Sequence, residues 1–169
     1  CDSLRDDPLF KILAGRLPET GDPLASQPTM SRFENSLSRT DLYRLAAVFA
    51  DVFIASYEAP PSVIIIDADD TEDKVFGSQQ QSLFNGYYGD RCFMPLRIYE
   101  GLSGKLITTV LKPGKRCDGK QMLSIIKRLV SRLQQQWPDT LMIFRGDSHF
   151  AYPEVMEWLE SHDNTAYIT

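Results

Sequence analysis

Residues 64–73 read IIIDADDTED, a run of isoleucines that passes directly into a cluster of acids. Such β-branched runs favour a buried strand, because these side chains pack well on a pleated sheet. Five acids follow between Asp67 and Asp73. Successive side chains of a strand point to opposite faces, so Asp67 and Asp69 should share one face and Asp70 should lie on the other. The cluster is either an acidic turn that ends a strand or a site built from carboxylates.

The segments that follow predict a mixed α/β fold. Residues 82–100 and 105–113 should be extended and should form a meander with the strand at 62–69. Apolar periodicity predicts helices at 118–137 and 153–161, and strands at 140–147 and 165–169. The predicted order β-β-β-α-β-α-β describes a mixed sheet flanked by helices.

A helical segment should precede this sheet. Residues 7–15 and 40–57 have helical periodicity, and residues 17–28 between them have the composition of a loop. The pair Pro60-Pro61 should end the helical part. We therefore predict a helical N-terminal segment at 1–61 and a sheet domain at 62–169.

A second acid should meet the first cluster across the sheet. If the first and fourth strands of the predicted order are neighbours, Asp147 at the end of MIFRGD faces Asp67 or Asp69. Two carboxylates brought together in this way repel each other unless a cation lies between them. Ligand sets made only of oxygen favour Mg²⁺ or Mn²⁺. The sequence thus predicts a metal site formed by Asp67, Asp69 and Asp147.

Composition excludes several classes of protein. The chain has 169 residues, 43% of them hydrophobic, which is enough for one domain with a real core. No apolar run approaches the roughly 18 residues of a membrane span, and no secretory leader is recognisable, so we expect a cytoplasmic protein without a membrane partner. The three cysteines are Cys1, Cys92 and Cys117. Their odd number and their spacing argue against a disulfide framework and against structural zinc.

Basic residues are distributed unevenly, although the net charge is −5. Ten of the 18 basic residues, but only two of the 23 acids, lie between Arg91 and Arg132. This segment is either a solvated surface or a footprint for the phosphates of DNA. The best candidates for phosphate contacts are Lys112, Lys115 and Arg116, which flank Gly114 in a turn.

One family resemblance suggests a phosphatase. Residues 67–71, DADDT, resemble the opening motif of the haloacid dehalogenase-like phosphatases, in which Asp67 would be the nucleophile and Asp69 the general acid. That family also has a later Gly-Asp followed by a second acid. Here Gly146-Asp147 is followed by SHFA, and the sequence after residue 71 predicts further strands rather than a helix.

A second resemblance extends over the whole chain. The phrases DPLFKILAGR, LASQPTMSRFEN, FNGYYGDRCFMPL, VLKPG and RGDSHFAYPE resemble the group 1 DDE transposases of bacterial insertion sequences. This resemblance implies a ribonuclease H-like fold with Asp69, followed by Thr71, and Asp147 as catalytic acids. Asp67 matches a further acid. It also implies Mg²⁺ or Mn²⁺, and duplex DNA as the partner, both the terminal inverted repeats of the transposon and the target.

The resemblance implies further features of the whole protein. The third acid of the family is a glutamate on a helix beyond the last strand, and the chain stops at Thr169, so we expect a C-terminally truncated, catalytically incomplete fragment. The protein should act in the bacterial cytoplasm in association with the nucleoid, with possible homo-oligomers in the transpososome. The alternatives are the phosphatase and a non-catalytic DNA-binding remnant.

Overall fold

The computed structural model describes residues 2–77, 79–80 and 82–169, with the side chain of Arg39 left out. The chain divides into two compact units, one up to Arg44 and one from Leu45 to Thr169. The predicted boundary after residue 61 stays a prediction. Within the described residues, none of the helices has both the length and the apolar character of a membrane span.

The first unit is helical. It contains a short 3-10 helix at Asp2–Leu4, α1 at Pro8–Leu13, α2 at Gln27–Ser36 and the beginning of α3, which runs over Arg39–Ala55. The Asp7 carboxylate caps α1 by accepting hydrogen bonds from the N–H groups of Leu9 and Phe10. The predicted helices at 7–15 and 40–57 correspond to α1 and α3. Periodicity did not mark α2, which lies within the segment predicted as helical at 1–61.

The second unit is built around a five-stranded sheet with the order β6-β5-β1-β7-β8. Its strands are β1 (Val63–Asp70), β5 (Leu96–Glu100), β6 (Leu106–Val110), β7 (Leu141–Arg145) and β8 (Thr165–Ile168). β5 is antiparallel to β1 and β6 is antiparallel to β5, whereas β7 is parallel to β1 and β8 is parallel to β7. With α4 (Gly119–Gln136) and α5 (Pro153–Glu160), the main sheet has the predicted order β-β-β-α-β-α-β.

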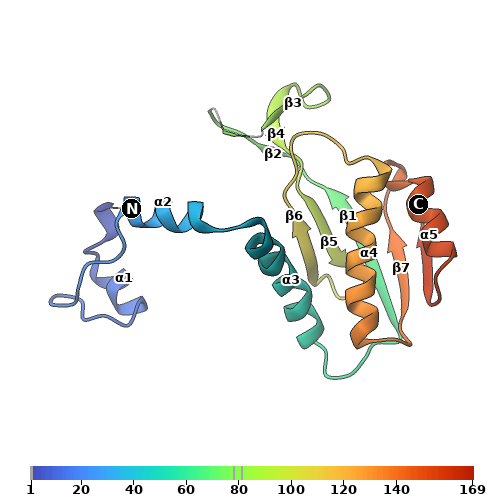
Figure 1. Ribbon diagram of the computed structural model, residues 1–169, viewed down its shortest axis with the longest axis horizontal. Coiled ribbons are helices and arrows are strands. Elements are labelled where there is room, and N and C mark those ends of the chain that lie inside the picture. Colours follow the sequence, from blue (N-terminus) through green and yellow to red (C-terminus); the bar gives the residue numbers. More distant parts are fainter. Residues whose placement is uncertain (1, 78, 81) are drawn as a thin grey trace. The chain divides into compact units, whose positions relative to one another are not determined.

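One face of this sheet forms the hydrophobic core. Alternation along β1 buries Ile64, Ile66 and Ala68, which belong to the same cluster as Met122 and Ile126 of α4. Figure 1 shows α4 lying across this face. The acids that alternate with Ile66 and Ala68 along β1 are thereby directed to the opposite face, which carries the site described below.

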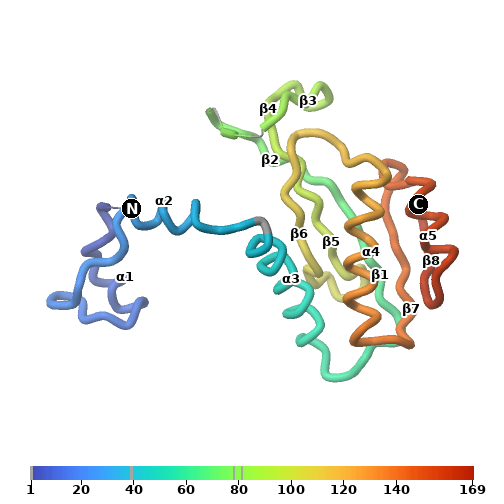
Figure 2. The backbone as a smooth tube through the Cα atoms, in the orientation of Figure 1, coloured from blue at the N-terminus to red at the C-terminus, as the bar shows by residue number. Residues whose placement is uncertain are grey.

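A second, smaller sheet was not anticipated. Residues 82–100 do not form one extended segment as predicted, because a tight turn with Gly89 at φ +70° folds the chain back after β3 (Leu83–Asn85) into β4 (Asp90–Phe93). With β2 (Asp73–Lys74), these strands form a three-stranded sheet of order β2-β4-β3, here called the β-finger. Figure 1 shows the β-finger beyond the end of β1, and Figure 2 traces the loop from β6 over that end of the sheet into α4.

Glu100 at the end of β5 is the most deeply buried acid of the described residues, at 2% exposure. Its carboxylate accepts hydrogen bonds from the N–H groups of Ile65, Leu102 and Ser103. Burial raises the pKa of Glu100, but these hydrogen bonds outweigh burial and hold the pKa below its ordinary value. The carboxylate therefore fixes the turn after β5, and with it Gly101, against β1.

Candidate acidic site at the ends of two parallel strands

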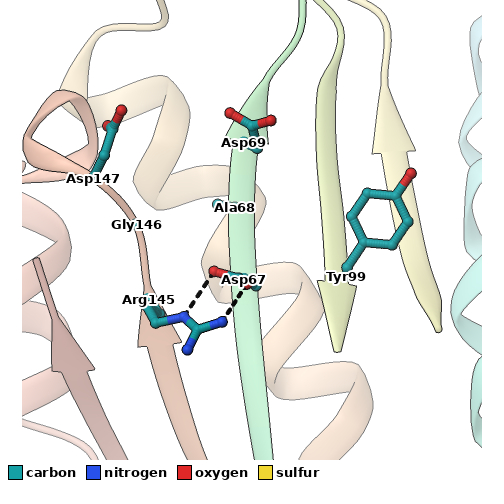
Figure 3. Close-up of a pocket in the computed structure, with 7 residues that line it drawn as sticks. All are labelled: Asp67, Ala68, Asp69, Tyr99, Arg145, Gly146 and Asp147. Carbon is teal, nitrogen blue, oxygen red and sulfur yellow. Dashed lines mark hydrogen bonds and ion pairs between the residues drawn. The ribbon is translucent and has the colours of Figure 1, made fainter. Parts of the chain in front are cut away.

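Three predicted acids line one open cavity of about 530 Å³. The lining residues are Asp67, Ala68, Asp69, Tyr99, Arg145, Gly146 and Asp147 (Figure 3). β1 and β7 are parallel neighbours whose carboxyl ends lie at the same edge of the sheet, with Asp67 opposite Arg145. The expectation that the first and fourth strands bring these acids together is therefore confirmed.

Asp70 lies on the other face of β1, as alternation predicts. Its carboxylate accepts hydrogen bonds from Lys112 Nζ at 2.6 and 2.7 Å. Both side chains are largely buried, with exposed fractions of 16% for Asp70 and 6% for Lys112. This ion pair joins the end of β1 to the loop after β6, on the face of β1 opposite to Asp69.

Asp67 is held by Arg145. The guanidinium donates Nε–H to one carboxylate oxygen at 3.0 Å and Nη2–H to the other at 2.5 Å (Figure 3). Gly101 makes room for this pair, because a Cβ there would lie 3.0 Å from Arg145 Nη2. The hydrogen bond from Arg145 lowers the pKa of Asp67, and Asp67 in turn raises the pKa of Arg145.

This geometry bears directly on the role predicted for Asp67. Because Arg145 engages both of its oxygens, the structure argues against Asp67 as a direct metal ligand and as a phosphatase nucleophile. Asp67 is better described as the ion-pair partner of Arg145. Only Asp69 and Asp147 then remain as acids that can hold a cation in this cavity.

Asp147 is positioned by the short turn that follows β7. Its Oδ1 accepts the N–H of His149 at 2.8 Å, and its Oδ2 lies 3.3 Å from His149 Nδ1. Gly146 allows this turn to fold back, because a Cβ at residue 146 would lie 2.6 Å from the Cβ of buried Phe150. The glycine and the histidine of RGDSHF therefore fix the direction of the Asp147 carboxylate.

The two remaining acids fit a hard divalent cation. Within the described residues, no group of three His, Cys, Asp or Glu side chains is close enough to hold a metal ion, so a complete protein cage is absent there. Mg²⁺ keeps several waters and is commonly held by one or two carboxylates together with substrate phosphates. Asp69, whose carboxylate has no hydrogen-bond or ion-pair partner in the described part of the chain, and Asp147 could serve as such a pair of oxygen ligands.

The three predicted phosphate contacts do not share one environment. Lys112 is buried against Asp70, so its amine is not available to a phosphate, and we correct that prediction. Lys115 and Arg116 are exposed. The Nε–H of Arg116 donates to Tyr152 Oη at 2.8 Å, and its guanidinium carbon lies 4.8 Å from the centroid of that ring.

Comparison with known families identifies the chain. The sequence model of the family described as transposase DDE domain group 1 matches residues 1–169. The chain belongs to this transposase family. The resemblance stated from the sequence is thus confirmed, and the phosphatase alternative is not favoured. The ribonuclease H-like mixed sheet expected for a DDE transposase domain agrees with the strand order of the second unit.

Solved transposase complexes are among the similar structures. The Mos1 mariner paired-end complex with Mn is 14% identical, with a TM-score of 0.43 over 86% of this chain and 51% of that chain. The Mos1 strand transfer complex is 14% identical, with a TM-score of 0.39 over 72% and 39%. The Drosophila P element transposase strand transfer complex is 12% identical, with a TM-score of 0.38 over 98% and 46%. The transposase domain thus spans about half or less of these chains, and no curated protein matches it.

Sequence reasoning did not single out Tyr99 and Arg145 as residues that line the cavity. Tyr99 lies opposite Asp67 on β5, and Arg145 lies opposite Asp67 on β7. The spacing of Arg145 two residues before Asp147 was visible in the sequence, and alternation puts residues 145 and 147 on one face. The positions of Tyr99 and Arg145 opposite Asp67 depend on the register of β5 and β7 against β1, which the sequence alone does not determine.

Proposed function

We propose that, in the whole protein, this transposase domain cleaves DNA at the ends of a mobile element and joins those ends to a target. The observation that carries the proposal is the pair Asp69 and Asp147, which lie at the ends of adjacent parallel strands in one open cavity. Strand ends hold carboxylates rigidly, and rigidity matters because a misplacement of about 1 Å can cost roughly a hundredfold in rate.

Each side chain has a distinct part in this proposal. Asp69 and Asp147 would hold Mg²⁺ or Mn²⁺, which when bound polarises a phosphate and activates water or a DNA 3′-hydroxyl. His149 keeps the Asp147 carboxylate directed into the cavity. Arg145 neutralises Asp67, so that the negative charge of the cavity is concentrated on the other two acids.

The proposed substrate is duplex DNA, comprising the terminal repeats of the element and the target. Lys115 and Arg116 would contact its phosphates, which carry no sequence information and so should be read without base preference. Similar proteins have been solved as paired-end and strand transfer complexes, which supports DNA as the partner. Assembly into homo-oligomers and a bacterial, nucleoid-associated location belong to the same proposal.

We also propose that residues 1–169 alone do not complete the reaction. Within the described residues, no group of three His, Cys, Asp or Glu side chains could hold a metal ion, and the third acid of the cavity, Asp67, is paired with Arg145. The glutamate expected from the family would come from a part of the protein outside these residues. A longer protein should therefore be active where residues 1–169 are not.

Metal binding tests the site itself. Mn²⁺ added to residues 1–169 should broaden the NMR signals of residues around Asp69 and Asp147, because both carboxylates face one cavity. The variant Asp69→Asn/Asp147→Asn should lose this broadening, whereas Asp73→Asn, an exposed acid in the β-finger, should keep it. Equal broadening in wild type and in the double variant would remove the assignment.

Removing Arg145 should increase the affinity for metal. Arg145→Met deletes the cation that engages Asp67 and leaves a third carboxylate in the cavity. A divalent ion and one carboxylate roughly 5 Å apart in water interact by about 1–2 kcal/mol, so Mn²⁺ affinity measured by calorimetry should rise about tenfold.

The matched control for this change is Asp67→Asn/Arg145→Met, in which the extra carboxylate is also neutral. Its Mn²⁺ affinity should return to near the wild-type value. An affinity that is unchanged or lower in Arg145→Met would show that Asp67 does not reach the cation and that Arg145 has no part in setting the charge of the site.

A further inference from the structure

The β-finger exposes aromatic side chains that the proposed chemistry does not use. Tyr87 is 90% exposed, Phe84 is 65% exposed and Tyr88 is 40% exposed. The rings of Tyr87 and Tyr88 meet edge to face, with centroids 4.9 Å apart. Residues 84–89, at the tip of the hairpin, read FNGYYG and so contain aromatic and amide side chains and glycines but no aliphatic side chain. Such rings cost free energy in water unless a partner covers them.

The β-finger lies next to the acidic site. β1 ends at Asp70 and β2 begins at Asp73, and the N–H of Thr71 donates to the carbonyl of Pro95, which leads back into β5. The β-finger therefore leaves and re-enters the main sheet at the edge that carries Asp69. Figure 1 shows it projecting beyond that edge.

A basic turn is packed against the same hairpin. Asn85 Nδ2 donates to the carbonyl of Gly114 at 3.1 Å, and Phe93 forms a β-bridge with Pro113. Residue 114 can approach so closely only without a side chain, because a Cβ would lie 2.6 Å from the carbonyl oxygen of Leu83 and would also clash with that of Cys92. Glycine thus fixes the turn against the hairpin that carries the aromatic rings, and the exposed Lys115 and Arg116 directly follow this turn.

Exposed aromatic rings beside cations are the usual combination for binding single-stranded nucleic acid, with bases stacked on rings and phosphates on cations. The acid of the hairpin itself, Asp90, is already paired with Lys74. Resting on the function proposed above, we propose that the β-finger and the 113–116 turn bind an unpaired DNA strand beside the acidic site. Phe84, Tyr87 and Tyr88 stack on its bases, and Lys115 and Arg116 contact its phosphates.

Fluorescence anisotropy with residues 1–169 and a labelled 12-nucleotide single strand, in EDTA, tests this surface. Tyr87→Ala/Tyr88→Ala should raise the Kd for the single strand at least tenfold, and should change the Kd for a duplex of equal length by less than twofold. Tyr87→Phe/Tyr88→Phe, which retains both rings, should stay within twofold of wild type for both ligands. Lys115→Ala/Arg116→Ala should weaken both ligands and reduce the salt dependence of binding.

Two control substitutions accompany these variants. Leu102→Ala replaces an exposed apolar residue in the turn between β5 and β6, and Lys127→Ala replaces an exposed cation on α4, away from the hairpin. Neither should change the Kd for the single strand by more than twofold. Circular dichroism should confirm that each variant is folded.

Three results would overturn the proposal. The first is an unchanged Kd for the single strand in Tyr87→Ala/Tyr88→Ala. The second is an equal loss of affinity for single strand and duplex in that variant. The third is a loss of self-association without an effect on DNA binding, which would assign the rings to a contact with a second copy of the chain. The assay contains no metal, so the two proposals can fail separately. If residues 1–169 bound no Mn²⁺ at Asp69 and Asp147 but still bound the single strand in EDTA, the proposed function would be contradicted and this inference would stand.

Discussion

In the full-length transposase, Asp147→Asn should lower the rate of transposon-end cleavage by at least about a thousandfold. Asp147 supplies one of the two carboxylates of the cavity that are not paired with Arg145, and the change removes a full negative charge while preserving shape. A bound divalent ion contributes several kcal/mol to stabilisation of the transition state, and each 1.36 kcal/mol corresponds to tenfold in rate. Nicking of a labelled duplex in Mg²⁺ or Mn²⁺ measures the effect.

The matched control for this experiment is Asp73→Asn. Asp73 belongs to the same acidic stretch but is exposed on the β-finger and does not line the cavity. Its cleavage rate should remain within about twofold of wild type. If Asp147→Asn retained more than a tenth of the activity, Asp147 would not be a catalytic residue, whatever its position in the cavity.

The main sheet could be predicted from the sequence because the patterns that determine its strands and helices lie within short stretches of sequence. The isoleucine run of β1 and the apolar pattern of α4 determine which face of each element is buried, and the crossover rule limits which strands can be neighbours. Those steps were enough to bring Asp69 and Asp147 to one edge. They required no knowledge of any contact between side chains.

The finer details of the site depend on pairs that are far apart in the chain. Asp67 and Arg145 are separated by 78 residues, and Asp70 and Lys112 by 42. Periodicity indicates on which face of a strand an acid lies, but it does not indicate which cationic side chain pairs with that acid. For this reason Asp67 was assigned to metal and Lys112 to DNA, although each is engaged within the protein.

The β-finger was missed for a related reason. Residues 82–100 are rich in residues that favour strands, so propensity alone does not distinguish one long strand from a hairpin followed by a separate strand. The hairpin depends on Gly89 at positive φ and on Asn85, whose side chain binds both its own turn and Gly114. The exposure of Tyr87 follows from that turn.

Lys112→Met should destabilise the fold by about 3–5 kcal/mol. The substitution retains most of the apolar volume but leaves the Asp70 carboxylate largely buried without its cation, and removal of one partner from a buried ion pair carries a cost of this size. Urea unfolding at pH 7 should report a lower midpoint with an unchanged slope. The substitution should also disturb the position of Asp69 in the acidic cavity, because Asp70 directly follows Asp69 on β1.

Two further variants separate charge from packing. Asp70→Asn/Lys112→Met removes both charges and should recover most of the lost stability, because replacing a whole buried pair by neutral groups is often close to neutral. Lys115→Met removes an exposed cation from the same loop and should change stability by less than about 0.5 kcal/mol. If Lys112→Met lowered stability no more than Lys115→Met does, the Lys112 amine would not be paired with Asp70 in solution and would again be a candidate phosphate contact. Duplex binding by the two variants would then decide between an ion pair and a phosphate contact for Lys112.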